Sequence, residues 1–189
     1  KIGCHILSGT GRKFLRGPRG TGFLYVSLDM IDQIEPPFID MHSATWTGND
    51  SYQFAAGAKR FENWESYVAG KIGLARAVRY ARDLGLTAIE ERVAELGATL
   101  REALSQVADV TVHDLGAKKC GIVTFRKRRE APAAMAARMR ERRINVSVTD
   151  LQSARLDFEE RGLEALVRAS VHYFNTENEI DRFVDAVKR

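Results

Sequence analysis

Cysteine, histidine and long apolar runs are scarce in this 189-residue chain, and their scarcity excludes several classes of protein. The two cysteines, Cys4 and Cys120, form no metal-binding motif, which favours a reducing, cytoplasmic compartment. No apolar run approaches the roughly 20 residues that a membrane-spanning helix needs. The histidines are scattered and indicate structural or surface positions: His5, His42, His113 and His172. We therefore expect a cytoplasmic protein that contacts no membrane and binds no metal.

Charge of one sign is not in strong excess either, because 29 Lys and Arg face 25 Asp and Glu, for a formal net charge of +4. Basic residues gather in two runs, Arg126–Arg129 and Arg138–Arg143. One interpretation of these runs is a small module that binds nucleic acid or another anion. No aromatic residues alternate with them as a base-stacking surface requires, and cations near a helix C-terminus are stabilising in any protein. We therefore expect no nucleic-acid partner.

The first sixty residues combine short apolar strands with a glycine-rich segment. Residues 2–7 and 22–27 have the pattern of strands, and the pair Gly17-Pro18 marks a turn between them. Residues 28–34 predict a helical turn, and the polar segment 36–59 predicts a loop. The chain begins with a lysine and enters an apolar segment at once. We therefore expect it to be the C-terminal portion of a longer protein.

From about residue 63 the pattern becomes helical. Asn63 is a candidate cap for a helix that starts at Trp64, and Gly85 occupies a position typical of a helix end. Two pairs have the spacing of a capping box: Thr87 with Glu90, and Thr176 with Glu179. The second long helix has apolar positions at steps of three and four residues: Ile89, Val93, Leu96, Leu100, Leu104 and Val107.

Strands alternate with helices in the remainder of the chain. Four ranges have strand patterns: 110–113, 120–125, 144–148 and 167–172. Pro132 suits the first turn of another helix between them. This order predicts an α+β domain in which long helices cover a small, largely antiparallel sheet.

The segment from Ser8 to Gly22 holds Lys13 among glycines and arginines, directly before an apolar strand. A phosphate-binding Walker loop is excluded, because the Gly-Lys-Ser/Thr order is absent and a strand follows. Ser8 and Thr10 offer hydroxyls to an anion, and Arg12 offers a charge-assisted donor. From these residues alone, a plain solvated connection and an anionic-cofactor site both stay open.

Three motifs, in order along the chain, resemble one family of enzymes. The first runs from Ser8-Gly9 through Lys13 to Gly-Pro-Arg-Gly-Thr-Gly and Leu24-Tyr25. The second is Arg60-Phe61-Glu62, and the third is Arg-Ala-Ser at 168–170 with Phe-Asn-Thr-Glu at 174–177. Together they resemble the class V aminotransferase superfamily of pyridoxal-phosphate (PLP) enzymes, in the branch of isopenicillin N epimerase-like and selenocysteine lyase-like proteins.

The resemblance implies a fold and a set of functional residues. It implies an α/β protein in which residues 1–62 are a remnant of the large PLP-binding domain and residues 63–189 form the small α+β domain. Lys13 is implied to form a Schiff base with PLP and then to act as general base. The same resemblance makes Ser8, Thr10 and Arg12 cofactor contacts, and Arg168 the group that binds the substrate carboxylate. It also implies a homodimer whose small-molecule substrate is an amino acid.

The sequence departs from the family pattern at several positions. Arg12 stands where the family usually has His, and Asn63–Ser66 replaces a segment whose Thr reaches a partner subunit's phosphate. The family's Asp for the pyridine nitrogen and its ring-stacking residue precede the matched region. The chain alone is therefore expected to bind the cofactor weakly or not at all, and a catalytically inactive, dimerising remnant is the alternative.

The family's cysteine desulfurases need a nucleophilic Cys on the loop before the Arg-x-Ser segment. Residues 147–162 contain no Cys, so persulfide chemistry of that kind is disfavoured. Cys120 lies in an apolar segment and is expected to be buried. Lyase, epimerase and transaminase chemistry on an amino acid or an amino-acid thio-conjugate all stay open.

Overall fold

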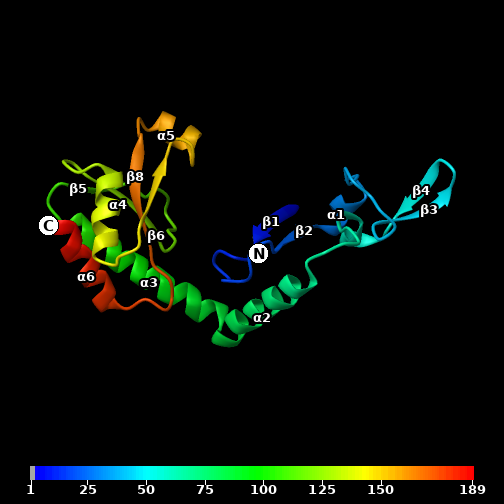
Figure 1. Ribbon diagram of the computed structural model, residues 1–189, viewed down its shortest axis with the longest axis horizontal. Helices are drawn as coiled ribbons and strands as arrows, with labels where there is room; N and C mark the ends of the chain where they lie inside the picture. Colours follow the sequence, from blue (N-terminus) through cyan, green and yellow to red (C-terminus); the bar gives the residue numbers. More distant parts are fainter. Residues whose placement is uncertain (1–2) are drawn as a thin grey trace. The chain divides into compact units, whose positions relative to one another are not determined.

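The computed structural model describes residues 3–189, which form two compact units (Figure 1). The first unit extends through Leu84, and the second comprises Gly85–Arg189. Ile2, the first residue of the predicted N-terminal strand, lies outside the described residues. Helix α2 (Val68–Leu84) belongs to the first unit, and the family-based boundary after residue 62 stays a prediction.

The first unit contains two antiparallel hairpins ahead of α2. Its elements in chain order are β1 (Ile6–Thr10), β2 (Gly22–Val26), α1 (Leu28–Ile31), β3 (Ala44–Gly48), β4 (Ser51–Phe54), the 3-10 helix η1 (Gly57–Phe61) and α2. β1 pairs with β2, from Ile6 opposite Val26 to Thr10 opposite Gly22. The predicted second strand and the helical turn after it are confirmed. The first strand lies further along than predicted and contains Ser8 and Thr10.

The segment 36–59, predicted as loop, contains the β3–β4 hairpin. Trp46 pairs with Tyr52, and the register shifts at Gly48, where the chain turns back to Ser51. Both aromatic side chains are exposed, with Trp46 at 76%. The prediction was wrong because the strands are polar and bury little, so they lack the apolar alternation by which strands are recognised.

Arg60, from the Arg-Phe-Glu motif, ties the loops of the first unit together. Its guanidinium is 8% exposed and donates to the Ile31 carbonyl at 2.9 Å, to Asp32 Oδ1 at 2.9 Å and to the Ala55 carbonyl at 3.3 Å. It also lies over the Phe54 ring, with 5.5 Å to the centroid. The motif's arginine is therefore a structural residue that joins the end of α1 to the end of β4.

Helix α2 starts four residues later than predicted, at Val68 instead of Trp64. The Trp64 amide donates to Asp40 Oδ2 at 2.7 Å, and Asp40 Oδ1 accepts from the His42 amide at 2.8 Å. These amide donors, that of Trp64 first, lower the pKa of Asp40 to about 2. Trp64 is thus held by the loop carboxylate at this point and does not begin the helix.

The second unit is a four-stranded antiparallel sheet covered by helices (Figure 1). Its elements are α3 (Leu86–Ser105), β5 (Val110–Val112), β6 (Ile122–Lys127), α4 (Pro132–Glu141), β7 (Ser147–Asp150), α5 (Arg155–Glu160), β8 (Ala165–Ser170) and α6 (Glu177–Lys188). The strand order is β5-β6-β8-β7. The predicted α+β arrangement and the α/β class are confirmed, although α5 was not predicted.

One apolar core joins α3, α4 and α6 to a single face of this sheet. The helices contribute Leu96, Leu100, Leu104, Met135, Met139, Ile180, Phe183, Val184 and Val187, and the sheet contributes Val123, Phe125, Val167 and Ala169. The predicted apolar stripe of α3 is buried as expected, since the three-and-four spacing places it on one side of the helix. The opposite face carries exposed polar side chains such as Arg168 and Arg126 together with Leu166, which is buried.

The helix termini test the predicted caps. Thr176 and Glu179 form both halves of a capping box at the start of α6, as predicted. The predicted Thr87–Glu90 box is wrong: α3 begins at Leu86 after Gly85, whose φ is 93°, and Glu90 instead pairs with a lysine. Gly85 alone separates α2 from α3 and occupies the cap position of α3. Thr87 therefore lies inside α3 and cannot cap it.

Part of the basic runs has a structural role at the C-terminus of α6. Lys127 Nζ donates to the Val187 carbonyl at 2.6 Å. Arg138 donates to the Ala186 carbonyl and pairs with Glu130 through bonds of 2.7 and 2.8 Å. Cations at the last carbonyls of a helix complement its dipole. These contacts explain Lys127 and Arg138 without a nucleic-acid partner.

Replacement of Arg60 by Ala should destabilise the first unit. Three acceptors lose a donor from a buried guanidinium, which costs about 2–4 kcal/mol. Both tryptophans of the chain, Trp46 and Trp64, lie in this unit, so urea unfolding followed by tryptophan fluorescence reports on it. Arg79→Ala, at an exposed position on α2, is the control and should change stability by no more than about 0.5 kcal/mol. Equal effects of the two variants would contradict the role of Arg60.

Candidate functional site

Lys13 lies in a loop closed by backbone hydrogen bonds between β1 and β2. The Gly11 amide donates to the Thr21 carbonyl at 2.9 Å and so extends the strand ladder by one step. The Gly17 amide then donates back to the Gly11 carbonyl at 2.8 Å, and the Arg16 amide to the Lys13 carbonyl at 3.0 Å. These bonds give residues 12–16 one defined path, so Lys13 extends from a fixed turn.

Close packing at the base of the loop requires glycine. A Cβ atom at Gly22 would lie 2.5 Å from the Gly9 carbonyl oxygen on the opposite strand. At Gly11 it would meet Thr21 Oγ1 at 2.6 Å, and that hydroxyl is held by a 2.6 Å bond to the Pro18 carbonyl. The glycines of the motif therefore serve the close approach of β1, β2 and the turn between them.

The four side chains predicted as cofactor contacts all extend from this hairpin: Ser8, Thr10, Arg12 and Lys13. Ser8 and Thr10 share one face of β1, since they are two residues apart in a strand. All four are exposed, and among residues 3–189 none of their side-chain polar atoms makes a hydrogen bond or ion pair. Two hydroxyls, a guanidinium and an amine form a donor set that suits an anionic aldehyde such as PLP.

Arg168 belongs to the second unit, where it lies on the face of β8 opposite the core. It is exposed between buried Val167 and Ala169. Thr124 of β6 lies opposite it on one side, and Ser147 of β7 on the other. Within the described part of the chain, no carboxylate pairs with the Arg168 guanidinium. A central strand thus presents a cation that is free to bind a carboxylate.

A buried ion pair fixes β6 beside Arg168. Arg101 Nε donates to Asp114 Oδ2 at 2.6 Å, and the two side chains are 13% and 9% exposed. Asp114 Oδ1 accepts from the Thr124 amide at 2.7 Å and from its hydroxyl at 2.6 Å. Sequence reasoning missed this network, because the three partners lie far apart in the chain and belong to no motif.

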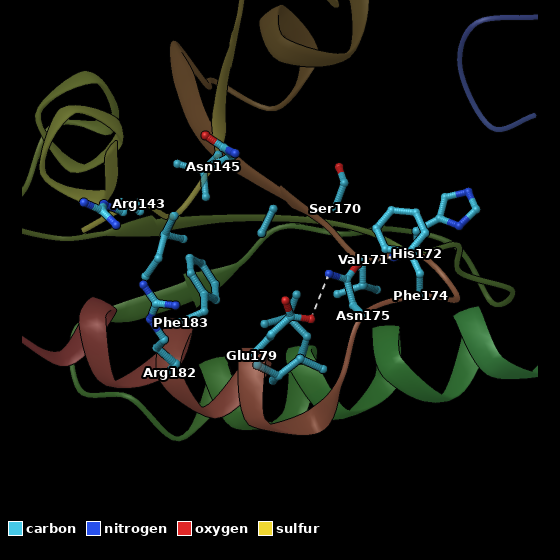
Figure 2. A pocket seen from close by; sticks show the side chains of 15 residues that line it. Arg143, Asn145, Ser170, Val171, His172, Phe174, Asn175, Glu179, Arg182 and Phe183 are labelled. Atoms are coloured by element: carbon cyan, nitrogen blue, oxygen red, sulfur yellow. Dashed lines mark hydrogen bonds between the residues drawn. The ribbon is translucent and has the colours of Figure 1, made fainter. Parts of the chain in front are cut away.

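A cavity of about 490 Å³ lies beyond Arg168, where β8 ends (Figure 2). Ser170, Asn145 and Asn175 line its polar side, and Leu100, Ile180 and Phe183 line its apolar side. Figure 2 shows the 3.2 Å hydrogen bond from Asn175 Nδ2 to Glu179 Oε2 at its edge. Ala169 also lines the cavity, which therefore reaches the core side of β8, and Arg168 is not among its lining residues.

Cys120 is exposed, which corrects the expectation that it is buried. It lies before β6 starts at Ile122, so the apolar run does not carry it into the sheet. The segment 147–162, which has no cysteine, forms β7, a turn and α5. No cluster of three metal-ligating side chains is found in residues 3–189. None of the helices in that range is long and apolar enough to span a membrane.

Comparison with known proteins decides the family. The family model described as aminotransferase class V matches residues 1–183. The chain belongs to the class V aminotransferase family. A relative from Xylella fastidiosa (strain Temecula1 / ATCC 700964), named "Probable cysteine desulfurase", is 31% identical over 187 residues, which are 98% of this chain and 44% of the relative. A protein of the same name from Pyrococcus abyssi is 26% identical over 100% of this chain and 47% of its own length.

Solved structures of this family share the fold of the chain. The apo cysteine desulfurase from Thermococcus onnurineus NA1 has a TM-score of 0.89 and 28% identity, over 97% of this chain and 46% of that one. A complex of the cystine C–S lyase C-DES with cysteine persulfide has a TM-score of 0.77 and 25% identity, over 95% and 45%. The class V chain described here thus spans less than half the length of the relatives it matches.

Replacement of Gly22 by Ala should weaken the pairing of β1 with β2 where the loop that contains Lys13 begins. The new methyl group meets a backbone oxygen that cannot turn aside, at a cost of about 1–3 kcal/mol. Amide exchange at Gly11, whose proton is bonded to the Thr21 carbonyl, should then accelerate roughly ten- to hundredfold. Gly20→Asn is the control, because Gly20 has a φ of 76°, which Asn tolerates, and a Cβ there would make an ordinary contact with Tyr67 Cδ1 at 3.9 Å. Unchanged exchange in Gly22→Ala would contradict the packing argument.

Proposed function

We propose that the chain is the lysine-bearing part of a PLP-dependent enzyme that acts on an amino acid. The observation that carries the proposal is Lys13 itself. Its amine extends from a loop closed by three backbone hydrogen bonds, beside unpaired hydroxyl and guanidinium groups. Family membership over residues 1–183 supports the same reading.

The roles proposed for the hairpin follow from the chemistry of its side chains. Ser8 and Thr10 would donate hydroxyl protons to the phosphate of PLP, and Arg12 would add a charge-assisted bond. The Lys13 amine would anchor the cofactor through its aldehyde carbon and, once released by the substrate amine, hold the proton taken from the substrate α-carbon. PLP supplies an electron sink that stabilises negative charge at that carbon.

Arg168 is the proposed partner of the substrate α-carboxylate. A guanidinium offers two parallel N–H donors, so it fixes the plane of the carboxylate as well as its position. The two residues opposite Arg168 leave space around its guanidinium. The Thr124 hydroxyl is bonded to Asp114, and Ser147 has a short side chain. An oriented carboxylate sets which bond at the α-carbon is aligned for reaction.

Cleavage of a carbon–sulfur bond is the reaction class that the relatives favour. Their names include cysteine desulfurase and cystine C–S lyase. Residues 147–162 of this chain offer no thiol to accept sulfur, so we propose that sulfur leaves on a small molecule, as in a lyase. Pyruvate and ammonia released from a cysteine conjugate would support this choice, and alanine would support desulfuration instead.

Loss of the Lys13 amine should abolish covalent cofactor binding. The whole enzyme to which the chain is proposed to belong is expected to show, when loaded with PLP, the visible absorbance band of lysine-bound PLP, and Lys13→Ala in that enzyme is expected to lose it. Lys71→Ala removes an exposed lysine of α2 in the same unit and should keep the band. A band that survives Lys13→Ala would reject this lysine as the anchor.

Arg168→Gln should weaken amino-acid binding without loss of the cofactor. Removal of a bidentate, charge-assisted pair is expected to raise the amino-acid concentration for a half-maximal spectral change roughly 100-fold. Arg140→Gln, at an exposed position on α4, removes the same charge and should leave that concentration within about twofold. Equal responses of the two variants would exclude a specific carboxylate contact at Arg168.

A further inference from the structure

Three basic side chains surround Thr124 on the polar face of the second unit's sheet. Thr124 lies opposite Arg168, and its carbonyl accepts the His113 amide at 2.8 Å, so β5, β6 and β8 meet at one level. Arg126 lies two residues further along β6, opposite Thr111. Residues two apart in a strand share a face, so Arg126 is a diagonal neighbour of both Arg168 and His113.

The pairing pattern brings the side chains of this group close together. The Thr124 amide and carbonyl both bond toward β5, to Asp114 Oδ1 and the His113 amide. Thr124 and Arg168 are therefore a non-hydrogen-bonded pair, the kind in which opposite side chains approach most closely. Diagonal neighbours such as Arg126 and Arg168 have Cα atoms about 7–8 Å apart.

The surface is hollowed beside Arg126. A cavity of about 550 Å³ is lined by Asp109, Val110, Thr111, His113, Arg126 and Arg128. It lies wholly in the second unit, on the β5 and β6 side of Arg168. Threonine and imidazole groups in its wall provide hydrogen-bonding partners for a small polar ligand.

The acids near this cavity are already paired, which leaves positive charge in excess. Asp114 accepts from Arg101 and from Thr124, and Asp157 pairs with Arg161 at 2.9 Å. Asp109 lies 4.0 Å from Arg128. In the range 3–189, no carboxylate pairs with the exposed guanidinium of Arg126.

The positive charge near this cavity affects the pKa of His113. Burial lowers its pKa first, and then Arg161, which follows α5, and Arg126 of β6 lower it further, while Asp114 raises it. The imidazole is consequently neutral near pH 7 and can donate one hydrogen bond. An anion bound between His113 and Arg126 would offset both arginines and move this pKa back up.

We propose that Arg126 and His113 form an oxyanion subsite beside Arg168, which selects amino acids with a second acidic group on the side chain. This inference rests on the proposed function, in which Arg168 binds the α-carboxylate. The second anion of a dicarboxylic amino acid lies a few bonds away, within the reach of a diagonal neighbour. Arg126 supplies the charge-assisted pair, and His113 supplies a neutral donor.

The test compares L-glutamate with L-glutamine, which have the same shape and differ by one charge. NMR of the full chain at neutral pH would follow the His113 ring protons and the Nε–Hε signals of Arg126 and Arg168. Because the site is partly exposed, glutamate is expected to bind about three- to tenfold more tightly than glutamine. Arg126→Gln should bring the two affinities within about twofold, whereas Arg129→Gln, which removes an exposed charge outside the group, should not.

Each outcome has a separate meaning. Shifts at Arg168 with both ligands, and at Arg126 and His113 with glutamate alone, support the subsite. Shifts at Arg168 with both ligands and none at Arg126 or His113 overturn the subsite and leave the proposed carboxylate contact intact. No shift at Arg168 with either ligand rejects that contact, and the subsite with it. A preference for glutamate that persists in Arg126→Gln also overturns the proposal.

Discussion

The hydrogen bond from the Gly17 amide to the Gly11 carbonyl is the constraint on which the proposed chemistry depends. It closes residues 12–16 into a loop, and the Gly11–Thr21 bond attaches that loop to a regular hairpin. Without this closure Lys13 would be a flexible lysine on a long connection. With it, the Lys13 amine, a guanidinium and two hydroxyls extend from one hairpin, as the proposed binding of an anionic cofactor requires.

The second unit presents exposed cations on the strands of its sheet. Its main core, on one face, anchors the strands, and the other face presents Arg168 and Arg126 beside the buried Leu166. The Arg101–Asp114 pair then holds Thr124 in place, although buried ion pairs contribute little net stability. Its role here is positional, because Asp114 accepts from the Thr124 amide and hydroxyl and so fixes the residue that lies opposite Arg168.

Much of this arrangement could be predicted from local sequence pattern. The α3 stripe, the capping box at Thr176 and the approximate positions of the second unit's strands along the chain follow from periodicity and cap chemistry. The family motifs select Lys13 and Arg168, whose roles stay predictions. What failed depended on contacts distant in sequence: Asp40 takes the Trp64 amide and delays α2, and the β3–β4 hairpin has polar strands with no apolar signature. The group around Thr124 has no local signal at all, because register alone assembles it.

The central claim is that the Lys13 amine is the covalent anchor of PLP. Borohydride reduction of the whole PLP-loaded enzyme that contains this chain, followed by peptide mass mapping, tests it most directly, since reduction makes the lysine–cofactor bond permanent. The account predicts a pyridoxyl group on the peptide that contains Lys13. A pyridoxyl group fixed on another lysine, with Lys13 unmodified, would contradict it.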